Sequence, residues 1–113
     1  MADHASELGL LAMLLMGHFV GDFVLQSDRM AVEKCPGADQ TLPWYWWLTA
    51  HSACQGLLVA WITGVPLLGL AEWITHWLTD YAKCRNAYGL AVDQALHLLA
   101  KLIWLGLALQ LNS

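Results

Sequence analysis

Polar side chains that could bind a metal ion or transfer protons recur inside four long apolar stretches of this 113-residue sequence. Within each stretch they are spaced four residues apart, so in a helix they lie one above another on a single face. The set comprises His18, Asp22 and Gln26; His51 and Gln55; Glu72, His76 and Asp80; and Asp93, His97 and Lys101. Four narrow polar stripes of this kind must face one another, because no other arrangement shields them from apolar surroundings.

The histidines of these stretches are also matched in depth. If successive helices run in opposite directions, His18, His51, His76 and His97 each lie seven or eight residues from the same end of the bundle. At a rise of 1.5 Å per residue, this corresponds to about 10–12 Å along each helix. The spacing therefore predicts a single layer of imidazoles. Three carboxylates lie one helical turn nearer that end: Asp22, Asp80 and Asp93.

Carboxylates inside a membrane are costly, on the order of 2.5–3.5 kcal/mol each at the bilayer centre. The three aspartates would repel one another unless they were protonated or shared a bound cation. Imidazoles and carboxylates from facing helices build divalent metal sites in helical bundles. We therefore expect one or two divalent ions (Zn, Mn or Fe). The expected ligands are His18, Asp22, His51, His76, Asp80 and His97. The alternative is that the histidines are hydrogen-bonded core residues without a metal.

Further polar residues near this layer extend the expected site. Asp93 is expected to be a ligand or a general base, and Gln26 or Gln94 could orient a substrate. Glu72 and Lys101 lie one turn deeper than the imidazole layer. We expect these two residues to form a buried ion pair, since neither readily reaches water. The alternative is that Lys101 extends its ammonium to the membrane surface.

The elements that must position these residues are predicted to be four transmembrane helices in one domain, residues 1–113. The expected spans are 8–26, 44–63, 66–82 and 89–111, each near the ~20 residues that cross a bilayer. The chain is 58% hydrophobic and 12% charged, about half the charged fraction of soluble proteins. A soluble four-helix bundle is the alternative, but it needs polar outer faces, and residues 56–74 show almost none. Gly17 and Gly21 would let the first helix approach a neighbour closely.

The basic residues predict an orientation. Arg29 and Lys34 lie between the first two spans, and Lys83 and Arg85 lie between the last two. Because basic loops stay in the cytoplasm, both termini are expected on the non-cytoplasmic side of a bacterial inner membrane. The net charge of −4 disfavours nucleic acid as a partner.

Two observations bear on processing and redox state. Asp3 and Glu7 stand where a signal peptide would carry positive charge, so no cleavable signal is expected. Cys35, Cys54 and Cys84 are odd in number and form no C-x-x-C pair. This pattern favours free thiols in a reducing compartment.

The motif H-x-x-x-D occurs at residues 18–22 and 76–80, and His51 and His97 occupy matching places in the following helices. This repeat suggests two tandem helical hairpins. The sequence also resembles the small bacterial and phage membrane proteins grouped as domain-of-unknown-function family 3307. The matching segments are GHFVGDFVLQSDRMAVEK (17–34), LTAHSACQGLLVA (48–60), WITHWLTDYAK (73–83) and VDQALHLLAKLIW (92–104).

This resemblance spans nearly the whole chain, and its most specific parts are H-x-x-x-D-F-x-L-Q and D-Q-x-x-H. The resemblance implies the fold and the functional positions more than a particular reaction, because the family is named for its unknown function. The positions it carries over are His18, Asp22, Gln26, His51, His76, Asp80, Asp93, Gln94 and His97.

The leading functional hypothesis is a metal-dependent hydrolase acting near the cytoplasmic face on a lipid or an amphiphilic ester or phosphoester. A divalent ion lowers the pKa of bound water towards ~7 and polarises an ester oxygen, so no Ser or Cys nucleophile is needed. Membrane lipid is the expected partner, and a homodimer could open the site sideways. The alternatives are an ion, proton or metal transporter, a b-type haem protein, and a non-catalytic phage or host interaction protein. Transport through one chain is disfavoured by the apolar segments 8–15 and 102–111.

Overall fold

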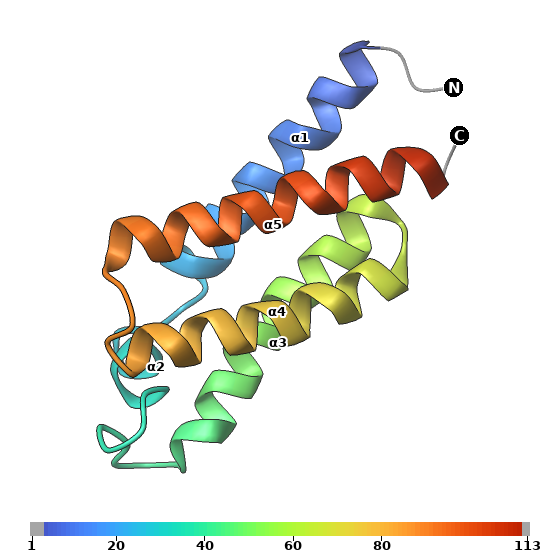
Figure 1. The fold of residues 1–113 in the computed structure, drawn as a ribbon. Coiled ribbons are helices and arrows are strands. Elements are labelled where there is room, and N and C mark those ends of the chain that lie inside the picture. The colour runs from blue at the N-terminus through green and yellow to red at the C-terminus, as the bar shows by residue number, and fades with distance from the viewer. Residues whose placement is uncertain (1–3, 112–113) are drawn as a thin grey trace.

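A computed structural model describes residues 4–111, and this part of the chain folds into helices with no strand (Figure 1). The elements are α1 (His4–Phe19), the π-helix η1 (Val20–Val24), α2 (Asp28–Glu33), α3 (Trp44–Thr63), α4 (Pro66–Cys84) and α5 (Leu90–Leu111). The predicted all-α class is confirmed. The four long helical segments coincide with the four apolar stretches to within a few residues. Residues 1–3 and 112–113 of the predicted domain lie outside the described residues.

The long helices form a closed ring of contacts in which α1 touches α3 and α5, and α4 touches α3 and α5. The most extensive packing joins α3 to α4, which belong to different hairpins of the suggested tandem repeat. Figure 1 shows the start of α1, the end of α5 and the α3–α4 turn at one end of the molecule. We call this the terminal end. The opposite end carries residues 25–43 and 85–89, and we call it the loop end.

Local sequence explains where α3 and α4 begin and end. The Asp39 carboxylate accepts a hydrogen bond from the first backbone N–H of α3, that of Trp44, at 2.9 Å. Gly64 ends the same helix with φ of 73°, a left-handed conformation that favours glycine. Pro66 then occupies the first turn of α4, where its missing N–H costs nothing. Together these residues make the tight reversal that lets α3 and α4 pack along their length.

The first apolar stretch is not a uniform α-helix, because its last turn widens into η1. The N–H of Leu25 donates to the carbonyl of Val20 at 2.8 Å, a five-residue spacing. Gly21 lies in this turn, and a Cβ there would stand 2.3 Å from Gln55 Nε2. A Cβ on Gly17 would stand 2.8 Å from Ile62 Cδ1. The expected close approach of α1 to a neighbour at these two glycines is confirmed, with α3 as the neighbour.

Apolar and polar side chains are segregated along the bundle. A cluster of buried apolar residues fills the terminal end and the middle: Leu14, Val59, Leu68, Ala100, Trp104 and Ala108. Nearer the loop end, most of the fully buried large side chains are polar, and they include His18, His51, His76 and His97. This is the reverse of an ordinary globular core, where buried charges are rare.

Two helical segments among the described residues are long and apolar enough to cross a membrane, Glu7–Val24 and Leu90–Leu111. Only 28% of each window is buried inside the chain, so most of its apolar surface faces outward. Core helices of soluble proteins can have the same length and composition.

The structure pairs two of the three cysteines that the sequence predicts to be free thiols. Cys35, just after α2, and Cys84, at the end of α4, form a disulfide. The two cysteines are 49 residues apart in the sequence, and they meet because the connection between η1 and α3 folds back over the end of α4. Neither an odd number of cysteines nor the absence of a C-x-x-C motif excludes such a bridge. Cys54 remains a free, exposed thiol.

The rest of the loop end is organised by Glu33 at the end of α2. Its carboxylate accepts hydrogen bonds from the backbone N–H groups of Gln40 and Thr41, at 2.6 and 2.7 Å. These donors favour the ionised form, so the pKa of Glu33 lies below its ordinary value, with the Thr41 N–H as the leading cause. A charged Glu33 thereby fixes the turn that leads into α3.

Candidate metal centre

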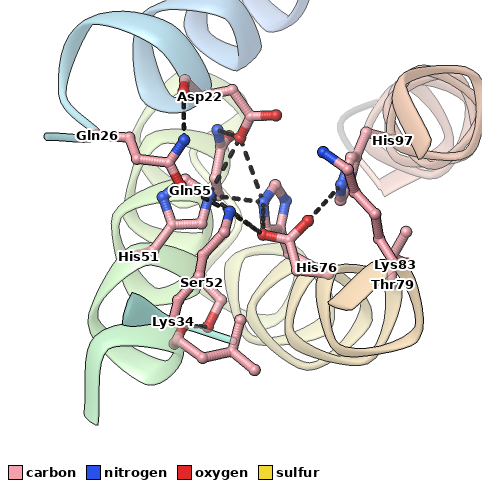
Figure 2. Close-up of polar contacts among 12 residues, drawn as sticks. Asp22, Gln26, Lys34, His51, Ser52, Gln55, His76, Thr79, Lys83 and His97 are labelled. Atoms are coloured by element: carbon pink, nitrogen blue, oxygen red, sulfur yellow. Dashed lines mark hydrogen bonds and ion pairs between the residues drawn. The ribbon is translucent and has the colours of Figure 1, made fainter. Parts of the chain in front are cut away.

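The imidazoles of His51, His76 and His97 converge between the helices (Figure 2), and the His18 ring lies beside them. The ring of His76 lies at their centre, with centroid distances of 4.0 Å to His97, 5.0 Å to His51 and 6.4 Å to His18. Each of the four residues is at most 1% exposed. Spacing by four residues, together with antiparallel helices, therefore brings side chains 79 residues apart into one buried cluster.

Four donor atoms lie close together in this cluster: His51 Nε2, His76 Nε2, Asp22 Oδ1 and Asp80 Oδ2. The two imidazole nitrogens lie 3.2 Å apart. Asp22 Oδ1 lies 3.2 Å from His51 Nε2 and 3.3 Å from His76 Nε2. Asp80 Oδ2 lies 3.3 and 3.4 Å from the same two nitrogens. We call these four atoms the donor quartet.

The second nitrogen of His76 explains how this ring is held. Its Nδ1 lies 2.8 Å from Glu72 Oε2, the distance of a hydrogen bond to a carboxylate. A neutral His76 that donates its Nδ1 proton to Glu72 has an unprotonated Nε2, which points into the quartet. Carboxylates bonded to the remote nitrogen are the usual support of metal-binding histidines.

Glu72 is in turn fixed by two donors from α5. Lys101 Nζ and Trp104 Nε1 approach Glu72 Oε1 at 2.8 and 2.9 Å. Glu72 and Lys101 are each 1% exposed. The structure thus pairs Glu72 with Lys101, as their positions one turn deeper than the imidazoles predict. This ion pair lies between the quartet and the apolar cluster.

Gln55 supports Asp22 from α3. Its Nε2 donates to Asp22 Oδ1 at 2.9 Å and to the carbonyl of His18 at 3.2 Å. The second bond ties α3 to the turn where α1 becomes η1. Gln55 belongs to one of the predicted polar stripes, and its four-residue spacing from His51 is the sequence signal for this supporting role.

Lys34 is the site residue that sequence reasoning missed. It was interpreted only as a marker of loop orientation, but its ammonium reaches back into the bundle. Nζ donates to Asp80 Oδ2 at 3.0 Å and to Gln26 Oε1 at 2.6 Å, and Figure 2 shows Lys34 and Gln26 beside His51. Gln26 also donates to the carbonyl of Asp22 at 2.9 Å. Lys34 lies in a loop without periodicity, so no spacing in the sequence points to this contact.

A second group of donors lies on the α5 side of the quartet. His97 Nε2 is 2.9 Å from Asp80 Oδ1 and 3.3 Å from Asp93 Oδ1. Asp22, Asp93 and His97 also offer ligand atoms that all lie within 4.8 Å of one another. Asp80 therefore turns one oxygen towards each group.

His18, an expected metal ligand, and Gln94, expected to orient a substrate, contact each other at the edge of the cluster. His18 lies in the imidazole layer, but its Nε2 is 2.8 Å from Gln94 Oε1 and 3.7 Å from Asp22 Oδ2. Gln94 Nε2 donates to Asp22 Oδ2 at 3.1 Å and to Asp93 Oδ2 at 3.2 Å. Gln94 thus links His18, Asp22 and Asp93. His18 lies beside Asp22 Oδ2, the oxygen that is not part of the quartet.

The apolar hollows between α3 and α4 lie away from this cluster. One of them is lined by Thr49, Leu70, Trp73, Ile74, Trp77 and Leu78, none of which contributes a donor atom to the groups above. Gln26 and Lys34 extend the polar cluster towards the loop end.

Fold and site together define an all-helical bundle with a buried centre of imidazoles and carboxylates. The chain matches the family described as "Protein of unknown function (DUF3307)" over residues 10–113 and belongs to that family. No curated protein and no solved structure matches the chain.

Proposed function

We propose that this chain is a metal-dependent integral membrane protein that hydrolyses a lipid or an amphiphilic ester or phosphoester. The observation that carries the proposal is the donor quartet. Zn²⁺ binds imidazole nitrogen and carboxylate oxygen at about 2.0–2.1 Å. In a tetrahedron of that size, neighbouring donor atoms are about 3.3–3.4 Å apart. The five distances within the quartet given above span 3.2–3.4 Å.

A proton on His76 in place of a metal fits these distances less well. A charged N–H forms one short, directed bond of about 2.7–2.9 Å to a carboxylate. His76 Nε2 instead has three neighbours at nearly equal distances of 3.2–3.4 Å. A cation shared by the two imidazole nitrogens and the two carboxylates would account for these near-equal distances.

Charge also favours a cation in this place. Asp22, Asp80, Asp93 and Glu72 are buried, and the ammonium groups of Lys34 and Lys101 pair with two of these four carboxylates. The Lys83 ammonium lies 3.9 Å from Asp93 Oδ2, but its side chain is 39% exposed, so we count only the buried groups. With neutral imidazoles, a net charge of −2 remains in a medium where unpaired charge is costly. One divalent ion neutralises it.

The outward faces of the helices support a membrane location. Leu57 and Trp61 on α3 are 73% and 80% exposed, and Leu67 on α4 is 69% exposed. Large apolar side chains are exposed on every long helix, far more than a soluble monomer leaves in water. We therefore propose four membrane spans in a bacterial cytoplasmic membrane, including α3 and α4, whose polar residues lie on their inner faces.

Hydrolysis is the reaction that such a centre supports best. A divalent ion there would acidify a water molecule and polarise an ester or phosphoryl oxygen. Asp93 lies beside His97 at the edge of the quartet and can accept a proton from water. Lys34 and Gln26 lie on the loop-end side of the quartet, where they can contact an incoming headgroup. A substrate reaching this depth from the membrane surface would be a lipid or another amphiphile.

Transport by the same cluster is the second candidate function, but the apolar interior of the terminal end argues against it. Beyond the Glu72–Lys101 pair, the interior is closed by the apolar cluster around Leu14, Val59 and Ala108, each at most 1% exposed. An ion or proton would need polar groups to continue through this region. The cluster is therefore open to one side only within a single chain.

We propose that the loop end faces the cytoplasm, as the four basic residues of the loops favour. The Cys35–Cys84 disulfide joins these same loops, and disulfides are rare in a reducing cytoplasm. In this orientation the two cysteines are a dithiol in the cell, and the bridge forms when the protein is exposed to oxidant.

Metal analysis of detergent-purified protein, combined with an activity assay, tests the proposed function. A transition metal should co-purify in stoichiometric amount and be lost in His51→Gln and Asp80→Asn, while helical content by circular dichroism is retained. Asp28→Asn, which changes an exposed carboxylate at the start of α2, is the matched control and should retain the metal.

The same preparations separate a hydrolase from a binding protein. Micellar phosphoesters and carboxyl esters should be cleaved by the metal-loaded protein and not by the two metal-free variants. Folded protein without metal at any pH would overturn the metal centre. Loaded protein that cleaves neither class of ester would overturn the assignment as a hydrolase.

A further inference from the structure

We infer that the cluster holds a second divalent ion on the α5 side of the donor quartet, with Asp80 as a carboxylate bridge between the two ions. This inference rests on the proposed function and extends it to a two-metal centre. The second ion would be bound by His97, Asp93 and Asp22 in addition to Asp80. Paired ions of this kind clamp both the attacking and the leaving oxygen in phosphoester hydrolysis.

The two oxygens of Asp80 point to different partners. Oδ2 belongs to the quartet with His51 and His76, whereas Oδ1 lies 2.9 Å from His97 Nε2. Figure 2 shows His97 on the opposite side of the centre from His51. A carboxylate held in this way offers one oxygen to each of two neighbouring ions.

Asp22 is arranged in a similar manner. Its Oδ1 is in the quartet, and its Oδ2 faces Gln94 on α5 at 3.1 Å. One of its oxygens lies within 4.8 Å of ligand atoms of both Asp93 and His97. The second group therefore has donors from three helical segments, η1, α4 and α5, as a closed site requires.

The Asp93 carboxylate gives a second, independent observation that points to a bound cation. The residue is 2% exposed, and its Oδ2 accepts a hydrogen bond from Gln94 at 3.2 Å. Its Oδ1 has no hydrogen-bond partner, although it is buried and lies 3.3 Å from His97 Nε2. A buried carboxylate oxygen without a donor costs free energy, and a cation shared with His97 removes that cost.

The charge of the cluster predicts the order of binding. The first divalent ion cancels the net charge of −2 left by the buried carboxylates and lysines, so the second ion makes the centre cationic. It should therefore bind more weakly than the first and more tightly when an anion binds with it. A two-ion centre would thus favour an anionic phosphoester over a neutral carboxyl ester.

Titration of the metal-free, detergent-purified full chain with Mn²⁺ tests this inference. Bound metal is measured by elemental analysis after desalting and by electron paramagnetic resonance, with and without inorganic phosphate. We expect two Mn²⁺ per chain, a spin-coupled signal, and tighter binding of the second ion in phosphate. Asp93→Asn and His97→Gln should each reduce the stoichiometry from two to one, whereas Asp28→Asn should leave it at two.

The possible results are distinct. Saturation at one ion per chain overturns the second site and leaves the proposed function standing, whereas no bound ion overturns both. Two ions that persist in Asp93→Asn, or two ions without spin coupling, also overturn the bridged site. If both variants fail to fold, the stoichiometry and coupling of the unaltered chain decide the question.

Discussion

The buried pair of Glu72 and Lys101 allows a prediction with a worked magnitude. Lys101→Met removes the ammonium that lies 2.8 Å from Glu72 Oε1. Glu72 then keeps its contacts to His76 and Trp104, but a 1% exposed carboxylate loses its cation. Breaking a buried pair in this way costs about 3–5 kcal/mol. We expect Lys101→Met to lower the free energy of unfolding by that amount.

The double variant Glu72→Gln/Lys101→Met should be less destabilised than Lys101→Met alone. It leaves no unpaired charge, and a glutamine oxygen can still accept the Trp104 N–H. Replacing a buried ion pair by neutral side chains of similar volume is often close to neutral, so we expect a loss of about 1–2 kcal/mol, allowing for the weakened contact to His76. The free energy of unfolding is measured by reversible denaturation in mixed micelles, with the metal removed.

Lys83→Met is the matched control, because the Lys83 side chain is 39% exposed and its ammonium lies 3.9 Å from Asp93 Oδ2. An exposed pair of this kind contributes about 0–1 kcal/mol. If the double variant is as unstable as Lys101→Met, the unpaired carboxylate is not the cause and the reasoning is refuted. A Lys101→Met variant as stable as Lys83→Met would refute it as well.

Three further predictions concern other parts of the molecule. Gly21→Ala should weaken metal binding and lower thermal stability, because its Cβ would stand 2.3 Å from Gln55 Nε2; metal binding equal to that of the unaltered chain would contradict this packing. Cys35 and Cys84 should react as free thiols with a membrane-permeant maleimide in intact cells but not in oxidised, purified protein; labelling of reduced cells by an impermeant maleimide would instead reverse the proposed orientation. The stability that ionised Glu33 contributes should be present above the ordinary pKa of glutamate and lost as the pH falls through its lower pKa in the folded chain. Glu33→Gln should abolish this part of the pH dependence of the free energy of unfolding. If the variant and the unaltered chain have the same pH profile of unfolding, Glu33 makes no such contribution.

Much of the architecture follows from the sequence, because helical periodicity determines both the face and the height of a side chain. The stretch predicted at 44–63 is α3 with the same bounds. The four-residue spacing and alternating helix directions were enough to place four imidazoles in one layer. They were also enough to set Glu72 opposite Lys101, since both lie one turn from a histidine of that layer.

The tertiary structure decided which atoms meet. Spacing does not specify helix rotation or side-chain rotamers, so it could not show that His76 is central while His18 turns to Gln94. It could not show that Asp80 divides its oxygens between two groups. Lys34 and the Cys35–Cys84 bridge lie in loops that have no periodicity, and only the folding of the loop over the end of α4 brings them to the site. The widened turn at η1 likewise depends on α3, whose Gln55 donates to the carbonyl of His18 next to that turn.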